Sequence, residues 1–135
     1  MGINAYLNFG GNCREVIDFY TQVFSVKHKE IMTYGQGGRD MNLAEKDKDL
    51  IMHAELDIYG SMLMLSDVTD DWPLKIGNNI SLLLTLEDQT LIDQIFTKLA
   101  EGGDVVMPLQ QTFWSKRYGF VIDHFGIGWQ LSSAE

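Results

Sequence analysis

The chain has 135 residues, about the length of one average globular domain. Hydrophobic residues make up 45% and charged residues 21% of it, so the composition excludes a disordered, collagen-like or coiled-coil chain. The formal net charge of −9 repels nucleic-acid phosphates and anionic lipids, which argues against both as partners. The longest uncharged apolar run, residues 80–86, is too short to cross a bilayer, and no signal-peptide pattern opens the chain, so we expect a cytoplasmic protein.

The first segments are predicted to form a strand and then an amphipathic helix. Residues 4–9 alternate in polarity, as a half-buried strand does. Residues 14–24 carry apolar side chains at helical spacing, and Asn12 with Glu15 matches a capping box. The single cysteine, Cys13, stands just before this pattern, where a small buried apolar residue is usual.

Three more strands are expected in the first half of the chain. Residues 27–34 read as one strand, and residues 50–58 and 61–66 as a hairpin that turns at Tyr59-Gly60. Residues 35–40 read as a flexible loop, and the acidic residues 67–71 as a solvated linker.

The second half repeats the order of strand, helix and three strands. Ile17-Asp18 is matched by Ile92-Asp93, and residues 56–66 are matched by residues 122–132. The predicted elements are a strand at 80–86, a helix at 89–100 and strands at 105–109, 117–122 and 128–131. We therefore predict an α+β fold of two repeated βαβββ modules, about 1–70 and 75–135, within a single domain of residues 1–135. Such modules form cupped mixed sheets whose concave face is the candidate site.

Several short motifs occur in a characteristic order: Phe9-Gly10-Gly11-Asn12, His53-Ala54-Glu55-Leu56, Leu63-Met64-Leu65-Ser66-Asp67, Thr112-Phe113-Trp114 and Asp123-His124-Phe125-Gly126. With them the chain resembles the PhnB-like branch of the vicinal-oxygen-chelate superfamily nearly end to end. The superfamily includes glyoxalase I, extradiol dioxygenases, fosfomycin-resistance enzymes and metal-free bleomycin-binding proteins. The resemblance implies a two-module cup and a homodimer whose modules pair edge to edge.

The superfamily's enzymes hold a divalent metal with His and Glu side chains on the first and last strands of each module. The resemblance places Asn4 or Ala5, Met64, Asn79 or Ser81, and Gln130 at these positions. An amide, a thioether and a hydroxyl do not make a tight site for a hard metal. We therefore expect neither a metal site nor a cofactor.

The best chemical constellation is on one predicted strand. His53, Glu55 and Asp57 share a face because side chains alternate along a strand. His53 could act as a general base that Glu55 orients, could bind metal with the carboxylates, or could serve only to hold strands together. We name His53 and Glu55 as the catalytic candidates.

Other candidates are ligand-binding side chains: Tyr6, Asn8, Met64, Trp114, Tyr118 and Gln130. Aromatic rings with a polar end suit flat organic ligands. Trp129 and Phe120 are expected in the core, and His28 and His124 at the surface.

Three functions remain open. The first is a metal-independent protein that binds a small aromatic or amphipathic molecule, which the missing metal ligands favour; the acidic charge would suit a cationic ligand. The second is a glyoxalase- or dioxygenase-type enzyme using His53 and Glu55, with or without metal. The third is a protein that acts through an interface. Members of the branch often carry the label 3-demethylubiquinone 3-methyltransferase, but the order of elements does not match the doubly wound fold of such enzymes.

Overall fold

The computed structural model describes residues 2–37 and 43–134 and divides the chain into two compact units, Met1–Lys75 and Ile76–Glu135. Each unit contains one four-stranded mixed sheet with a helix on one of its faces. The predicted α+β class and the repeated modules are therefore confirmed. Within the described ranges, no helix is both long and apolar enough to span a bilayer.

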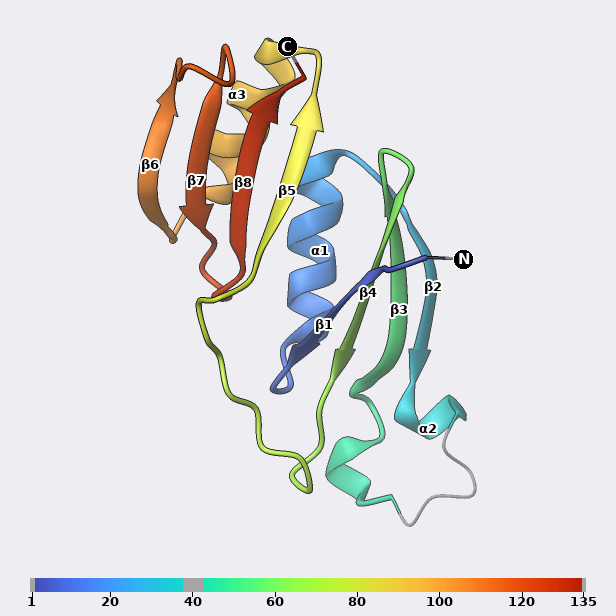
Figure 1. Cartoon of the computed structure of the whole chain (residues 1–135). Helices are drawn as coiled ribbons and strands as arrows, with labels where there is room; N and C mark the ends of the chain where they lie inside the picture. Colours follow the sequence, from blue (N-terminus) through green and yellow to red (C-terminus); the bar gives the residue numbers. More distant parts are fainter. Residues whose placement is uncertain (1, 38–42, 135) are drawn as a thin grey trace. The chain divides into compact units, whose positions relative to one another are not determined.

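Unit one follows the predicted order. The strand order in its sheet is β1-β4-β3-β2, with β1 parallel to β4 and the other pairs antiparallel (Figure 1). Its elements are β1 (Ala5–Phe9), α1 (Cys13–Phe24), β2 (His28–Thr33), α2 (Tyr34–Gly37), a 3₁₀ turn (Glu45–Asp47), β3 (Ile51–Ile58) and β4 (Ser61–Asp67).

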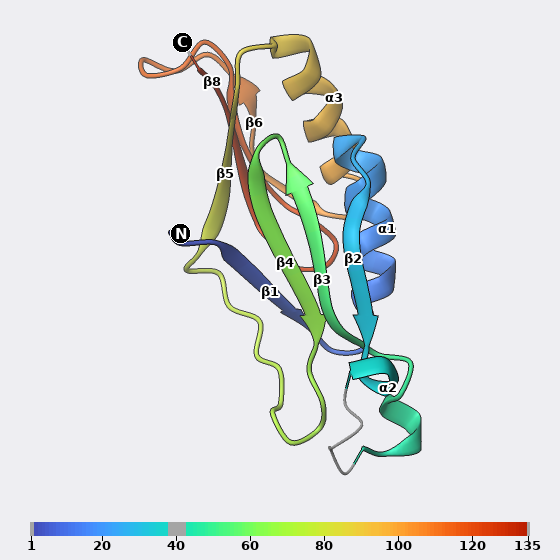
Figure 2. The same ribbon diagram turned by 90° about the vertical axis from the view of Figure 1, so that its right-hand side faces the viewer.

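Helix α1 lies along one face of this sheet, behind the strands as they are seen in Figure 2. Its apolar stripe, which includes Ile17, Tyr20 and Phe24, is fully buried. The sheet meets it with alternate residues of β3 and β4, such as Leu56 and Leu65. Because side chains alternate, the residues in between lie on the opposite side of the sheet. We call that side the distal face of unit one.

The start of α1 is held differently from the prediction. Asn12 makes no side-chain capping bond. Instead, the Asp67 carboxylate at the end of β4 accepts from the backbone N–H of Gly11 and of Cys13, both at 2.9 Å, and from that of Ile51 at 2.9 Å. The expected capping box is therefore wrong. Asp67 is also 2% exposed and belongs to β4, so the prediction of a solvated linker fails at its first residue.

The segment after β2 is partly helical. Residues 34–37 form the single turn α2, and the backbone N–H of Gly35 donates to Lys48 O at 2.9 Å. The expectation of a loop is thus wrong for residues 35–37, and that of a strand is wrong for Tyr34, because backbone bonds to the segment before β3 order the turn. Residues 38–40 of the predicted loop lie outside the described residues.

Unit two repeats the plan, with strand order β5-β8-β7-β6 and β5 parallel to β8. Helix α3 lies behind β7 and β8 in Figure 1. The elements are β5 (Ser81–Leu86), α3 (Gln89–Leu99), β6 (Asp104–Gln110), β7 (Tyr118–Ile122) and β8 (Gly128–Ser133). By the same alternation, the side of this sheet turned away from α3 is the distal face of unit two.

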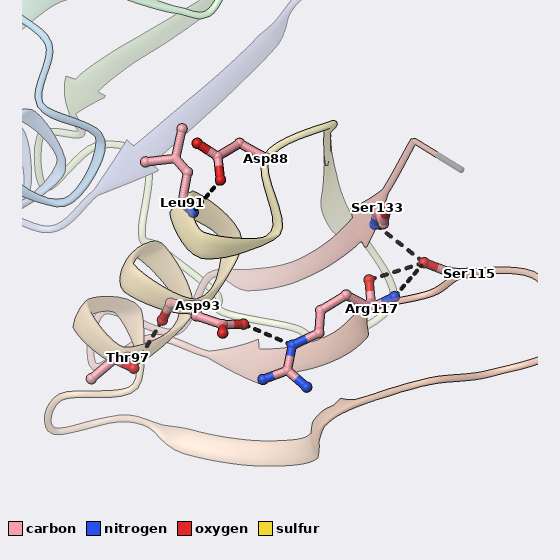
Figure 3. Close-up of polar contacts among 7 residues, drawn as sticks. All are labelled: Asp88, Leu91, Asp93, Thr97, Ser115, Arg117 and Ser133. Atoms are coloured by element: carbon pink, nitrogen blue, oxygen red, sulfur yellow. Dashed lines mark hydrogen bonds and ion pairs between the residues drawn. The ribbon is translucent and has the colours of Figure 1, made fainter.

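Hydrogen bonds hold α3 and the end of β8 in place (Figure 3). Asp88 caps the helix, since its carboxylate accepts from Leu91 N at 3.1 Å. The Asp93 carboxylate on the helix accepts a hydrogen bond of 2.7 Å from Nε of Arg117, which lies just before β7. The Ser115 hydroxyl donates to Arg117 O and accepts from Ser133 N. These bonds connect α3 to the segment before β7 and that segment to the end of β8.

Candidate functional site

A chain of three hydrogen-bonded side chains crosses the distal face of unit one. The Tyr6 hydroxyl lies 3.1 Å from His53 Nδ1, and His53 Nε2 lies 2.9 Å from Glu55 Oε2. Tyr6 comes from β1 and the other two from β3, so β4 lies between the partners. The predicted pair His53 and Glu55 is thus brought into contact, with Tyr6 added at its end.

The chain becomes more exposed toward Tyr6. The His53 and Glu55 side chains are 28% and 25% exposed, whereas Tyr6 is 44% exposed. The Tyr6 and His53 rings are in contact, with centroids 5.7 Å apart and planes tilted by 45°. Both imidazole nitrogens of His53 have partners within the chain, and Tyr6 is its more exposed end.

Two other predicted ligand-binding residues lie on the same face. Met64 on β4 is in register with Tyr6 on one side and with Glu55 on the other, so its thioether side chain stands between them. Asn8 lies two residues from Tyr6 on β1 and accepts a bond from the Ser66 hydroxyl at 3.2 Å. Five of the predicted site residues therefore share one face: Tyr6, Asn8, His53, Glu55 and Met64.

Strand β2 adds residues that the sequence analysis missed. Met32 is paired in register with His53, and Glu30 with Glu55, so both belong to the distal face. Lys29 forms an ion pair of 3.6 Å with Asp57 of β3. A bulge between residues 28 and 30 of β2 breaks its simple alternation, and for this reason the sequence pattern did not assign a face to Glu30.

Unit two carries a second, neutral chain of side chains. The Tyr118 hydroxyl donates to Gln130 Oε1 at 2.6 Å, and Gln130 Nε2 donates to the Ser81 hydroxyl at 2.7 Å. The Trp114 ring packs edge-on against Tyr118, with centroids 5.4 Å apart. The structure thus joins the three predicted residues of this half and adds Ser81.

The two chains lie on the distal faces of their sheets but share only one corresponding position, that of His53 and Tyr118. Met64 pairs with Glu55 as Gln130 pairs with Phe120, so His53 corresponds to Tyr118 and Glu55 to Phe120. The sequence repeat that aligns Asp57 with Asp123 is therefore one residue out of step on β3 and β7. Phe120 consequently lies on the distal face rather than in the core as expected, whereas Trp129 is 3% exposed and is a core residue.

The donor set does not fit the superfamily's metal. The corresponding positions carry Met64 and Gln130 on the last strands, and Gln130 is bonded to Ser81 on the first strand of its unit. Thioether, amide and hydroxyl groups are weak ligands for hard divalent ions. In the parts of the chain that the structure describes, no three His, Cys, Asp or Glu side chains are grouped to hold a metal ion.

The remaining reactive side chains lie elsewhere. Cys13 is fully buried, and this burial together with the nearby Asp67 carboxylate raises the pKa of its thiol, so the nucleophilic thiolate is disfavoured. His28 and His124 are exposed, as expected.

Comparison with known proteins identifies the family. The family model described as 3-demethylubiquinone-9 3-methyltransferase matches residues 1–132. The chain belongs to this PhnB-like family. Protein PA1353 from Pseudomonas aeruginosa is 34% identical, with a TM-score of 0.87 over 98% of this chain and 97% of that one.

Two further solved structures share the fold. A PhnB protein from Bacillus cereus, described as a putative 3-demethylubiquinone-9 3-methyltransferase, is 31% identical, with a TM-score of 0.78 over 99% of this chain and 100% of that one. The fosfomycin resistance protein FosX from Listeria monocytogenes shares the fold at 11% identity, with a TM-score of 0.66 over 100% of this chain and 94% of that one. The fold is therefore that of the vicinal-oxygen-chelate superfamily. Two separate four-stranded mixed sheets are not the doubly wound sheet of adenosylmethionine-dependent methyltransferases, so the family description is not supported as a literal activity.

Proposed function

We propose that this PhnB-like protein binds a small organic ligand on the distal face of unit one, without the superfamily's metal. The observation that carries the proposal is the hydrogen-bonded chain Tyr6–His53–Glu55, which is flanked by Met64 and partly exposed. Ligand sites combine apolar and aromatic surface with a few placed polar groups, and this face offers both. Strand pairing alone does not require two polar rings and a carboxylate to be bonded in series.

The apolar part of the face suits a flat or amphipathic molecule. Met32 and Met64 border the polar chain, and methionine side chains adapt to ligands and make favourable contacts with aromatic rings. The net charge of −9 favours a cationic ligand over an anionic one. Trp114, Tyr118 and Gln130 form the corresponding surface in unit two, and we propose that they bind ligand as well.

The test combines elemental analysis with thermal shifts. Protein purified without chelator is analysed for metal and then screened against nickel, zinc, manganese and a panel of planar cationic and aromatic compounds. We expect no stoichiometric metal and a rise in Tm with organic compounds. The rise should be lost in His53→Ala and kept in His28→Ala, which alters an exposed histidine of the same unit. About one metal per chain with metal-dependent stabilisation, or a rise unchanged in His53→Ala, would overturn the proposal.

A second candidate function is acid–base catalysis on the bound molecule. It is favoured by one feature, the contact of Glu55 with His53 Nε2, because a carboxylate that orients an imidazole is the usual support of a general base. A FosX variant has been solved with Mn(II) and 1S,2S-dihydroxypropylphosphonic acid, and that protein shares only the fold with this chain. Turnover of a stabilising compound by wild type, reduced at least about 100-fold in Glu55→Gln with binding retained, would establish catalysis. Compounds recovered unchanged would exclude it for that panel.

We also propose that the protein is a cytoplasmic homodimer. Strand β6 is at an edge of its sheet and exposes Val105 and Val106, and such edges tend to pair with another chain. The buried single thiol of Cys13 suits a reducing compartment. Light scattering of wild type and Val106→Lys tests the first part, with a dimer expected for wild type and a monomer for the variant. Cell fractionation tests the second.

A further inference from the structure

The hydrogen bonds of the distal chain in unit one have a direction. An ionised carboxylate has no proton, so Glu55 can only accept, and the proton of the bond must be on His53 Nε2. In a neutral imidazole the other nitrogen then carries a lone pair. His53 Nδ1 therefore accepts, and the hydroxyl that donates to it is that of Tyr6.

The direction decides what Tyr6 offers to a ligand. A phenol has one proton and can also accept. Because the Tyr6 proton is directed at His53 Nδ1, the side of the hydroxyl that faces outward presents oxygen lone pairs. Tyr6 is the most exposed member of the chain, so a ligand group that meets it must be a hydrogen-bond donor.

Negative charge at the other end of the chain from Tyr6 favours a cationic donor. Glu30 and Glu55 stand directly opposite each other on neighbouring strands, an arrangement of like charges that destabilises a sheet. The Asp57 carboxylate on the same face is already paired with Lys29. Glu30 and Glu55 thus leave an excess of negative charge at the Glu55 end of the chain, and a cationic donor on this face would be attracted toward it.

We propose that Tyr6 accepts a hydrogen bond from a cationic N–H group, so that the ligand is a protonated amine with an apolar or aromatic body lying against Met64. The inference rests on the proposed function and narrows it from a small organic molecule to a protonated nitrogen base. It also assigns His53 and Glu55 as positioning residues that fix the proton of Tyr6.

The direction of the chain is measured without a ligand. Long-range ¹H–¹⁵N NMR distinguishes the two tautomers of a histidine, and it is recorded at about pH 8, above the ordinary range of imidazole ionisation. We expect His53 to carry its proton on Nε2. The chemical shift of its Nδ1 should change in Tyr6→Phe and remain the same in Tyr59→Phe. Tyr59 is the matched control because its hydroxyl donates to the backbone oxygen of Phe24. A proton on Nδ1 would overturn the proposal.

The donor requirement is measured with two aromatic cations. Benzylammonium carries N–H groups, and benzyltrimethylammonium has the same charge and ring with none. Binding at about pH 8, where an amine remains protonated, is followed by the Met64 methyl signal. Wild type should bind benzylammonium about tenfold or more tightly than the quaternary ion, as expected for loss of a charged hydrogen bond. Tyr6→Phe should abolish the preference for benzylammonium, and Tyr59→Phe should retain it.

Equal affinities for the two cations, a preference that survives in Tyr6→Phe, or no binding of benzylammonium would each overturn the inference. The proposed function has a separate outcome. If neutral aromatic compounds shift the Met64 methyl and do so less in His53→Ala, the site stands and only the amine specificity fails.

Discussion

At the end of β4, the Asp67 carboxylate joins three segments of unit one by accepting three backbone N–H bonds. Asp67→Ala should lower the free energy of unfolding by about 3 kcal/mol or more, because it leaves these donors without a partner in a site with little access to water. Asp67→Asn should cost less, since its amide oxygen can still accept. Urea titration measures both. Asp49→Asn, at an exposed carboxyl, is the control, and an Asp67→Ala protein as stable as this control would contradict the assignment.

Cys13 gives the protein an alkaline limit. Burial raises the pKa of its thiol above the ordinary 9.0, so below pH 9.0 the thiol is protonated in both folded and unfolded chains. As pH rises above 9.0, the unfolded chain ionises and the folded chain does not, and stability falls. Burial also raises the pKa of Tyr34 and of Tyr59, so their ionisation in the unfolded chain likewise lowers stability at alkaline pH.

Wild type should be more stable than Cys13→Ala at pH 7, because the substitution leaves a cavity in the core. This difference in stability should shrink above pH 9. Urea titrations of both proteins across that range measure it. The folded wild type should also resist a thiol reagent that the unfolded chain consumes rapidly. A difference that is independent of pH, or fast labelling under native conditions, would refute the buried protonated thiol.

At the level of single residues, the sequence predicted part of the site. His53 and Glu55 could be recognised because strand alternation is local. The contact of Tyr6 with His53 could not, because it depends on β1 pairing with β4 and on β4 pairing with β3. Asp67 was missed because it begins an acidic run, and only the fold shows that it points at backbone donors.

At the scale of elements, the two helices begin by different means. Asp88 caps α3 with its own side chain, whereas α1 relies on Asp67 from the sheet. Asp88→Ala should therefore cost about 1 kcal/mol of stability and Asn12→Ala only a few tenths. Thermal unfolding of the two variants is a direct comparison. An equal loss in both would mean that Asn12 caps α1 in solution.

Strand β7 needs a glycine where α3 packs against it. A Cβ added at Gly119 would lie 2.7 Å from Phe96 Cε2 and 2.9 Å from Leu109 Cδ2. Gly119→Ala should destabilise the protein by about 1 to 3 kcal/mol through overpacking. Gly77→Ala, whose new Cβ would have its nearest neighbour at 3.5 Å, should be close to neutral in the same thermal unfolding measurement. A neutral Gly119→Ala would show that α3 packs less closely than described.

Element order followed well from the sequence. The hairpin at Tyr59-Gly60 was predictable because a two-residue turn there requires positive φ, which is 52° at Tyr59 and 95° at Gly60. The position of Phe120 was not, because the turn after β7 is longer than the one after β3 and shifts the pairing by one residue. Hydrophobic periodicity therefore predicts the strands and helices, whereas strand pairing determines on which face of the sheet a side chain lies.

At the scale of the whole molecule, the repeat produces two sheets with the same strand order but with different side chains on their distal faces. Unit one carries an ionisable chain on its distal face, and unit two carries a neutral one on its own. Neither set of side chains suits the superfamily's hard metal, and this shifts the expected function from metal chemistry to binding of an organic molecule.

The central claim is that the distal face of unit one binds such a molecule without metal. The most direct measurement is methyl NMR of chelator-treated protein labelled at the methionines, titrated with aromatic and cationic compounds. We predict saturable shifts of the Met64 and Met32 methyl signals that weaken in His53→Ala. If those signals never move, or move only after a divalent metal is added, the account is wrong.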